Sequence, residues 1–101
     1  MAYVLSRKAE EDVINIFVEG VHSFGLHQAE RYHSQLEKCF QFLADNPTAA
    51  PQRTEITPPV RIHPSGSHLV IYRIEPDNEV FIIRVRHERE DWVASTPGTE
   101  R

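Results

Sequence analysis

Residues 60–87 read VRIHPSGSHLVIYRIEPDNEVFIIRVRH, and this stretch decides the fold. Apolar and polar side chains alternate with a period of two in residues 60–63, 68–74 and 80–87, which is typical of β-strands. Turn-forming residues separate these segments at 64–67 and 75–78. The spacing therefore predicts three consecutive antiparallel strands.

Two amphipathic segments, residues 7–22 and 27–44, come before these strands. Their apolar residues recur at helical spacing, namely Ala9, Val13, Ile16 and Phe17 in the first, and Ala29, Tyr32, Leu36, Cys39, Phe40 and Leu43 in the second. Ser6 can cap the first helix through its side chain, and Gly25 can end it in a left-handed conformation. We therefore expect an antiparallel helical hairpin.

Residues 3–5 predict a short strand before the hairpin, which gives the order β-α-α-β-β-β. This order defines an α+β fold in which a helical hairpin packs on a small, mainly antiparallel, curved sheet. Residues 48–59 are rich in proline and predict a rigid surface loop without secondary structure. At 101 residues, the chain has the length of one domain. We assign residues 1–92 to this domain and residues 93–101 to a flexible C-terminal tail.

The predicted sheet is apolar on both faces near its middle. Alternation places Val70, Tyr72 and Ile74 opposite Leu69 and Ile71, and it places Phe81, Ile83 and Val85 opposite Val80 and Ile82. The helical hairpin can cover only one face. We expect sheet curvature, the tail with Trp92 or a partner protein to shield the other.

The formal net charge of −4 argues against broad binding to nucleic acid, and we predict no direct sequence-specific contact with it. Five arginines nevertheless fall between positions 53 and 86 and could form a local basic patch, namely Arg53, Arg61, Arg73, Arg84 and Arg86. The longest apolar runs are too short to cross a membrane. The first residues lack the pattern of a secretory signal, and the single cysteine, Cys39, fits a reducing compartment. We expect a cytoplasmic protein.

Polar side chains gather on the predicted strands and just beyond them, namely Arg61, His63, His68, Tyr72, Arg73, Arg84, Arg86, His87 and Arg89. Metal-free cleavage of RNA needs a general base, a general acid and a cation near the phosphate, and these residue types could supply them. The alternative is that the arginines form surface ion pairs with nearby glutamates while histidine and tyrosine border the core. Both interpretations remain open from the residues alone.

Neither a metal nor a cofactor is expected. The chain has six histidines, but their spacing does not match a metal-binding pattern. It has only four glycines, none of them at the spacing of a phosphate-binding loop. Cys39 lies on the apolar stripe of the second helix, where we expect a buried, unreactive thiol.

Several short motifs, in order along nearly the whole chain, resemble the ParE branch of the ParE/RelE superfamily of type II toxin–antitoxin modules. In the first half they are Tyr3-Val4-Leu5-Ser6 with Ala9 and Asp12, Phe24-Gly25 with Gln28-Ala29-Glu30-Arg31-Tyr32, and Leu43-Ala44-Asp45-Asn46-Pro47. In the second half they are Gly66-Ser67-His68, Tyr72-Arg73, Ile83-Arg84-Val85-Arg86-His87 and Asp91.

The resemblance implies a RelE/ParE-like fold, a hetero-oligomer with a cognate ParD-like antitoxin, and DNA gyrase as the target. For this branch it implies inhibition by protein binding rather than an enzymatic reaction, in modules that stabilise plasmids. The residues that it assigns to target or antitoxin binding are Arg61, His68, Tyr72, Arg73, Arg84 and His87. Arg86 departs from the family pattern and adds a cation to this set.

Two other functions stay open. The first is a RelE-type ribosome-dependent mRNA interferase, a metal-independent endoribonuclease using His87, Tyr72 and Arg84. The absence of lysine after Lys38 and the acidic net charge count against docking on ribosomal RNA. The second is a non-toxic module that only binds the antitoxin.

Overall fold

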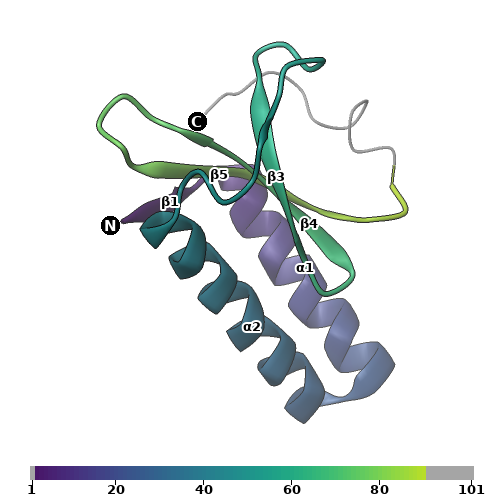
Figure 1. Cartoon of the computed structure of the whole chain (residues 1–101). Helices are drawn as coiled ribbons and strands as arrows, with labels where there is room; N and C mark the ends of the chain where they lie inside the picture. Colours follow the sequence, from purple (N-terminus) through teal and green to yellow (C-terminus); the bar gives the residue numbers. More distant parts are fainter. Residues whose placement is uncertain (1, 91–101) are drawn as a thin grey trace.

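The chain folds as a helical hairpin on one face of a sheet, in a computed structural model that describes residues 2–90 (Figure 1). Its elements are β1 (Tyr3–Leu5), α1 (Arg7–Phe24), α2 (Leu26–Asp45), β2 (Gln52–Arg53), β3 (Val60–Ser65), β4 (His68–Ile74) and β5 (Val80–His87). The predicted α+β class is confirmed. The assignments that concern Trp92 and the tail at 93–101 lie outside the described residues.

The sheet has five strands in the order β1-β5-β4-β3-β2. Strands β2 to β5 pair antiparallel with their neighbours, whereas β1 pairs parallel to β5, from Tyr3 opposite Val80 to Leu5 opposite Ile82. The helical hairpin and strands β2 to β4 all lie between β1 and β5 in the chain, and together they form the long connection that a parallel pairing requires. The first and last strands of the domain thus become neighbours.

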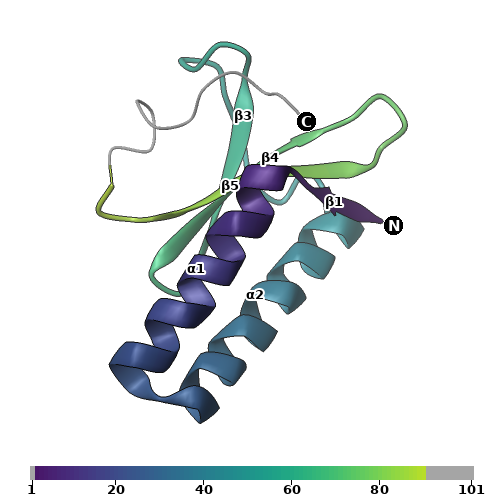
Figure 2. The same cartoon turned by 180° about the vertical axis from the view of Figure 1, so that it is seen from behind.

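The helix ends lie within two residues of the predicted ones, although Gly25 combines its positive φ with an extended ψ of 164° instead of the predicted left-handed cap. The Ala9 N–H donates to the Ser6 hydroxyl at 2.9 Å, which caps the start of α1. Gly25 has a φ of 92°, and its N–H donates to the Val21 carbonyl at 3.0 Å at the end of α1. Glycine accepts this backbone conformation without strain, so the chain can turn back into α2. Both cartoon views show the two helices side by side, with the connection between them projecting beyond the sheet (Figure 2).

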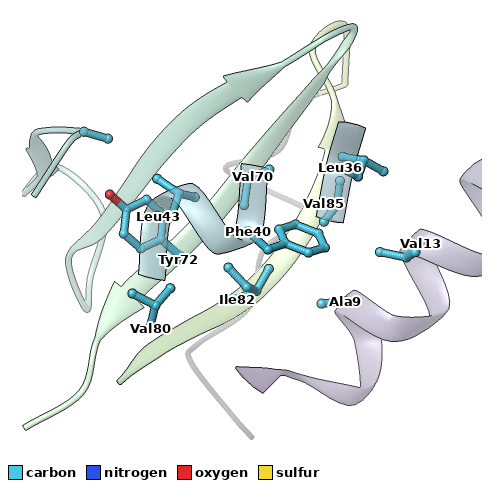
Figure 3. Packing of buried hydrophobic residues seen from close by; sticks show 11 residues of the cluster. Ala9, Val13, Leu36, Phe40, Leu43, Val70, Tyr72, Val80, Ile82 and Val85 are labelled. Carbon is cyan, nitrogen blue, oxygen red and sulfur yellow. The ribbon is translucent and has the colours of Figure 1, made fainter. Parts of the chain in front are cut away.

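The main core lies between the helices and the sheet (Figure 3). Phe40 of α2 lies near its middle, with Ala9 and Val13 of α1 on one side and Tyr72 of β4 on the other (Figure 3). Leu36 and Leu43 extend the same apolar stripe of α2, and Val70, Val80, Ile82 and Val85 complete the sheet side. The helical periodicity therefore identified the buried faces of both helices correctly.

The second face of the sheet is buried by the chain itself. Ile71 and Phe81 are 0% exposed, and they form a second cluster with Val60 and Ile83. Ile56, from the loop before β3, packs against this cluster together with Val4 and Ile62. Of the three expected means of shielding this face, a partner is therefore not required for these side chains.

The predicted face of Val85 is wrong. Val85 packs in the main core with Val80 and Ile82, not with Phe81 and Ile83. The pairing of β4 with β5 shifts register between Ile71 and Tyr72, so β5 contains one extra residue at this point. A bulge of this kind reverses the alternation beyond it, and the pattern of residue types alone does not reveal it.

The segment at 48–59 is not entirely loop. Gln52 and Arg53 form β2 and pair with Arg61 and Val60 of β3. Proline is tolerated beside such a short edge strand, and the proline-rich composition concealed it. Strand β3 also continues to Ser65, two residues beyond the predicted end at His63.

Large apolar side chains are exposed mainly on the helical hairpin. They are Ile14, Val18, Phe24, Leu26 and Phe42. In the described part of the chain, no helix combines the length and the apolar character needed to cross a membrane. The uncovered apolar surface is therefore on the helices rather than on the sheet.

Candidate functional site

A cleft of about 360 Å³ lies between the helical hairpin and the end of the sheet where β4 begins and β5 ends. Its apolar walls come from the helices and include Val13, Ile16, Phe17 and Leu36. Its polar wall includes Tyr32 of α2, Ser67 of the β3–β4 turn, His68 of β4 and His87 of β5. The cleft thus brings together His68 and His87, two of the predicted site residues.

Tyr32 connects α2 to the β3–β4 turn. Its hydroxyl donates to the Ser65 carbonyl at 3.2 Å, accepts from the Ser67 N–H at 3.0 Å, and lies 2.6 Å from Nδ1 of His68. A tyrosine hydroxyl has one proton to donate. The Ser65 carbonyl can only accept, so the Tyr32 proton is assigned to that hydrogen bond. We therefore assign the proton between Tyr32 and His68 to Nδ1 of His68. Neutral His68 then presents an unprotonated Nε2.

His68 and His87 are direct partners across β4 and β5, and their rings meet edge to face with centroids 5.3 Å apart. Burial lowers the pKa of His68, and the neighbouring His87 lowers it further. His87 has the opposite proton arrangement, because its Nδ1 accepts from the Arg89 N–H at 3.1 Å. Its Nε2 therefore carries the proton when the ring is neutral.

Gly66 lets the β3–β4 turn approach Tyr32. Its φ of 59° lies in the left-handed region, and a Cβ atom at this position would be only 2.6 Å from the Tyr32 hydroxyl oxygen. Both the backbone conformation and the space therefore require glycine. The Gly66-Ser67-His68 motif is thus explained by packing against α2.

Asp12 of α1 binds the edge of β5. Its carboxylate accepts from Arg84 Nε at 2.8 Å, from a terminal nitrogen of Arg84 at 2.9 Å and from the Val85 N–H at 3.0 Å. The hydrogen bond to Asp12 raises the pKa of Arg84. Arg86 lies 3.7 Å from the same carboxylate and also pairs with Glu90. The Arg84 and Arg86 side chains are therefore engaged within the chain.

The remaining predicted residues lie elsewhere on the sheet. Tyr72 is 0% exposed, and its hydroxyl donates to the Pro47 carbonyl at 2.7 Å. Its cross-strand partner Arg61 donates to the Ala50 carbonyl at 2.6 Å. Arg73 pairs with Glu75 at 3.2 Å and lies over the ring of Phe81, 4.8 Å from its centroid. The roles of these residues in target or antitoxin binding stay predictions.

The arginines of the predicted basic patch mostly contact acidic groups. Arg53 pairs with Glu55, Arg73 with Glu75, Arg84 with Asp12, and Arg86 with Asp12 and Glu90. Such pairing lowers the local positive potential that phosphate binding requires. Among residues 2–90, no group of three or more histidine, cysteine, aspartate or glutamate residues could hold a metal ion.

Sequence reasoning missed the connecting roles of Tyr32 and Asp12. Tyr32 was assigned to the apolar stripe of α2, and its hydroxyl contacts depend on the β3–β4 turn about thirty-five residues away in the chain. Asp12 carried a detectable signal, because it lies three residues after Ala9 and next to Val13 on the buried face of α1. A carboxylate at such a position needs a donor or a cation beside it.

The fold is similar to that of a solved structure titled "Chromosomal ParDE TA system from P. aeruginosa". The TM-score is 0.74 at 20% sequence identity, and the match covers 86% of this chain and 95% of the other. The Toxin ParE1 proteins of two Mycobacterium tuberculosis strains, CDC 1551 and H37Rv, are each 32% identical over 89 residues, or 88% of this chain and 91% of each relative. Toxin ParE1 of Caulobacter vibrioides is 33% identical over 86 residues, or 85% of this chain and 88% of the relative.

These similarities define the class of the protein as a toxin of a type II toxin–antitoxin system. The sequence profile described as "ParE toxin of type II toxin-antitoxin system, parDE" matches residues 3–92. The chain belongs to the ParE toxin family.

Proposed function

We propose that this toxin inhibits DNA gyrase by binding it as a protein, without catalysing a reaction, and that a cognate ParD-like antitoxin neutralises it. The observation that supports this proposal most directly is that arginines of the sheet form ion pairs with carboxylates of the same chain. Arg84, which is 12% exposed, is held by Asp12, which is 10% exposed. A cation held in this way is poorly placed to bind a phosphate group.

The mRNA interferase alternative loses support from the positions of its three residues. The Tyr72 hydroxyl is buried and bonded to Pro47, whereas His87 lines the cleft at the other end of the sheet. Arg84 donates two hydrogen bonds to Asp12. A base, an acid and a cation acting on one phosphate must lie within hydrogen-bonding distance of it, and these residues do not converge in this way.

Two features support a partner segment on the helical hairpin. Ile14, Val18, Phe24 and Leu26 leave apolar surface uncovered, and the adjoining cleft has mainly apolar walls. An amphipathic segment of an antitoxin could cover such a surface. The solved P. aeruginosa structure is titled as a ParDE system, which supports a ParD-like partner and a hetero-oligomer here. We place His68 and His87 among the contact residues, and we place the complex in the cytoplasm, where gyrase acts.

The direct test measures supercoiling of relaxed plasmid by purified gyrase as the toxin is titrated. We expect supercoiling to fall with toxin concentration and to recover when the antitoxin encoded beside the toxin gene is added. Unchanged supercoiling at saturating toxin would contradict the gyrase proposal.

Two parallel measurements separate the alternatives. Primer extension on translated mRNA after induction would show discrete cleavage sites only for an mRNA interferase. Normal growth on induction, combined with tight antitoxin binding, would identify a non-toxic module.

A further inference from the structure

His87 organises the turn that follows β5, residues 87–90, here called the exit turn. The Arg89 N–H donates to the His87 ring at 3.1 Å, and the Glu90 N–H donates to the His87 carbonyl at 3.0 Å. The His87 N–H in turn donates to the Glu90 carboxylate at 3.2 Å. The ring, the N–H and the carbonyl of His87 therefore all hold the exit turn.

The ring contact depends on a lone pair. Nδ1 of His87 can accept from Arg89 only while it carries no proton. A protonated imidazole is a donor at both nitrogens, so Nδ1–H would then face the Arg89 N–H. Protonation of His87 thus replaces a hydrogen bond with two opposed donors.

His68 responds differently, although its ring is in contact with that of His87. In the assigned tautomer, its Nδ1 carries a proton and donates it to the Tyr32 hydroxyl, 2.6 Å away. A second proton would enter at Nε2 and leave this hydrogen bond intact. The contact between the Ser67 N–H and the Tyr32 hydroxyl does not involve an imidazole either. Acid should therefore break the Arg89 contact after β5 and leave the Tyr32 contacts before β4 intact.

We propose that the His68–His87 pair is an acid-sensitive device that releases the Arg89 amide of the exit turn at low pH, while Tyr32 keeps the β3–β4 turn fixed to α2. His87 also lines the cleft, so the device lies at this end of it. Two charged imidazoles side by side would add repulsion to the loss of the Arg89 contact.

Charged and titratable groups of each neighbouring element surround the device. They are Asp12 and Glu19 of α1, Tyr32 and His33 of α2, Arg86 of β5, and Glu88 and Glu90 of the exit turn. Glu19 lines the cleft and, like Asp12 and Glu90, favours the charged form of His68. Burial and His87 oppose that charge and lower the pKa of His68 overall. At neutral pH His68 is therefore uncharged.

Amide hydrogen exchange of the whole chain, corrected for intrinsic rates and followed from pH 7.5 to pH 5, tests the proposal. As the imidazoles titrate, we expect the protection factor of the Arg89 amide to fall at least about threefold, which is the loss of one hydrogen bond of about 0.7 kcal/mol. The Ser67 amide should keep its protection factor over the same range, because its acceptor is Tyr32.

His87→Asn is the matched control, because an asparagine oxygen can accept from the N–H two residues ahead without titrating. We expect this variant to protect the Arg89 amide equally at both pH values. His68→Asn keeps His87 and its contact with Arg89, so Arg89 should still be released at low pH. Equal protection of Arg89 at both pH values in the parent chain would overturn the proposal. Loss of protection at Ser67 in parallel with Arg89 would also overturn it, because it would indicate general opening.

Discussion

Replacing Asp12 with alanine should destabilise the toxin more than any other single loss of an acidic side chain that the described contacts identify. The change removes the acceptor of both Arg84 hydrogen bonds and of the Val85 N–H. It removes the carboxylate partner of a guanidinium that is 12% exposed and of a backbone donor. An unpaired buried charge and an unsatisfied buried N–H are both costly.

The size of the loss follows from these contacts. Removing one member of a buried ion pair costs about 3–5 kcal/mol, and an unsatisfied backbone donor costs about 1–3 kcal/mol. The contributions share one carboxylate and are not additive, and Arg84 can turn partly toward solvent. We therefore expect Asp12→Ala to lower the free energy of unfolding by about 3–4 kcal/mol. Asp12→Asn keeps an oxygen for Val85 and should cost less, about 1–2 kcal/mol.

Urea unfolding monitored by circular dichroism measures these differences, provided that the slope of free energy against urea stays constant. Glu30→Ala is the matched control, since it removes the same charge from an exposed position of α2 and should change stability by less than about 0.5 kcal/mol. If Asp12→Ala cost no more than Glu30→Ala, Asp12 could not be holding β5. A double-mutant cycle with Arg84→Met would then show no coupling between positions 12 and 84.

Three further outcomes follow from the site. Tyr32→Phe should lower the free energy of unfolding by about 1–3 kcal/mol, measured by urea titration, because Ser67 and His68 lose the oxygen that they share. Gly66→Ala should lower the melting temperature, because a Cβ at this position would lie 2.6 Å from the Tyr32 hydroxyl oxygen; an unchanged melting temperature would refute the contact. Stability should fall as the pH drops below about 6.5, because the lowered pKa of His68 means that the unfolded chain binds this proton first, and His68→Asn should flatten the fall.

The sequence predicts most of the fold because local signals decide most of it. The strand at Tyr3–Leu5, the start of α1 behind Ser6 and the turn at Gly25 are each set by neighbouring residues, and each lies where predicted. The face of Val85 was wrong for the opposite reason. It depends on the register between β4 and β5, which packing of the whole sheet determines.

The candidate site was predicted only in part. His68 and His87 come together because they are paired across two adjacent strands, and strand alternation can anticipate such a pairing. Tyr32 joins them from α2 through a hydroxyl, and this contact requires the three-dimensional packing of the hairpin on the sheet. Arginines on the strands could likewise be read as a phosphate site until their carboxylate partners were located.

The position of Asp12 follows from the shortness of β1. Strand β1 pairs with β5 only from Val80 to Ile82, so beyond this point no strand within residues 2–90 pairs with this edge of β5. The Ser6 N–H donates to the Ile82 carbonyl at 2.9 Å, the Ser6 hydroxyl donates to the Ile83 carbonyl at 2.7 Å, and Asp12 accepts from the Val85 N–H. An edge strand with free backbone groups invites pairing with another chain. The backbone of β1 therefore bonds the first part of this edge, and side chains at the start of α1 bond the part that follows. Loss of the Asp12 carboxylate should for this reason destabilise the sheet as well as the helix.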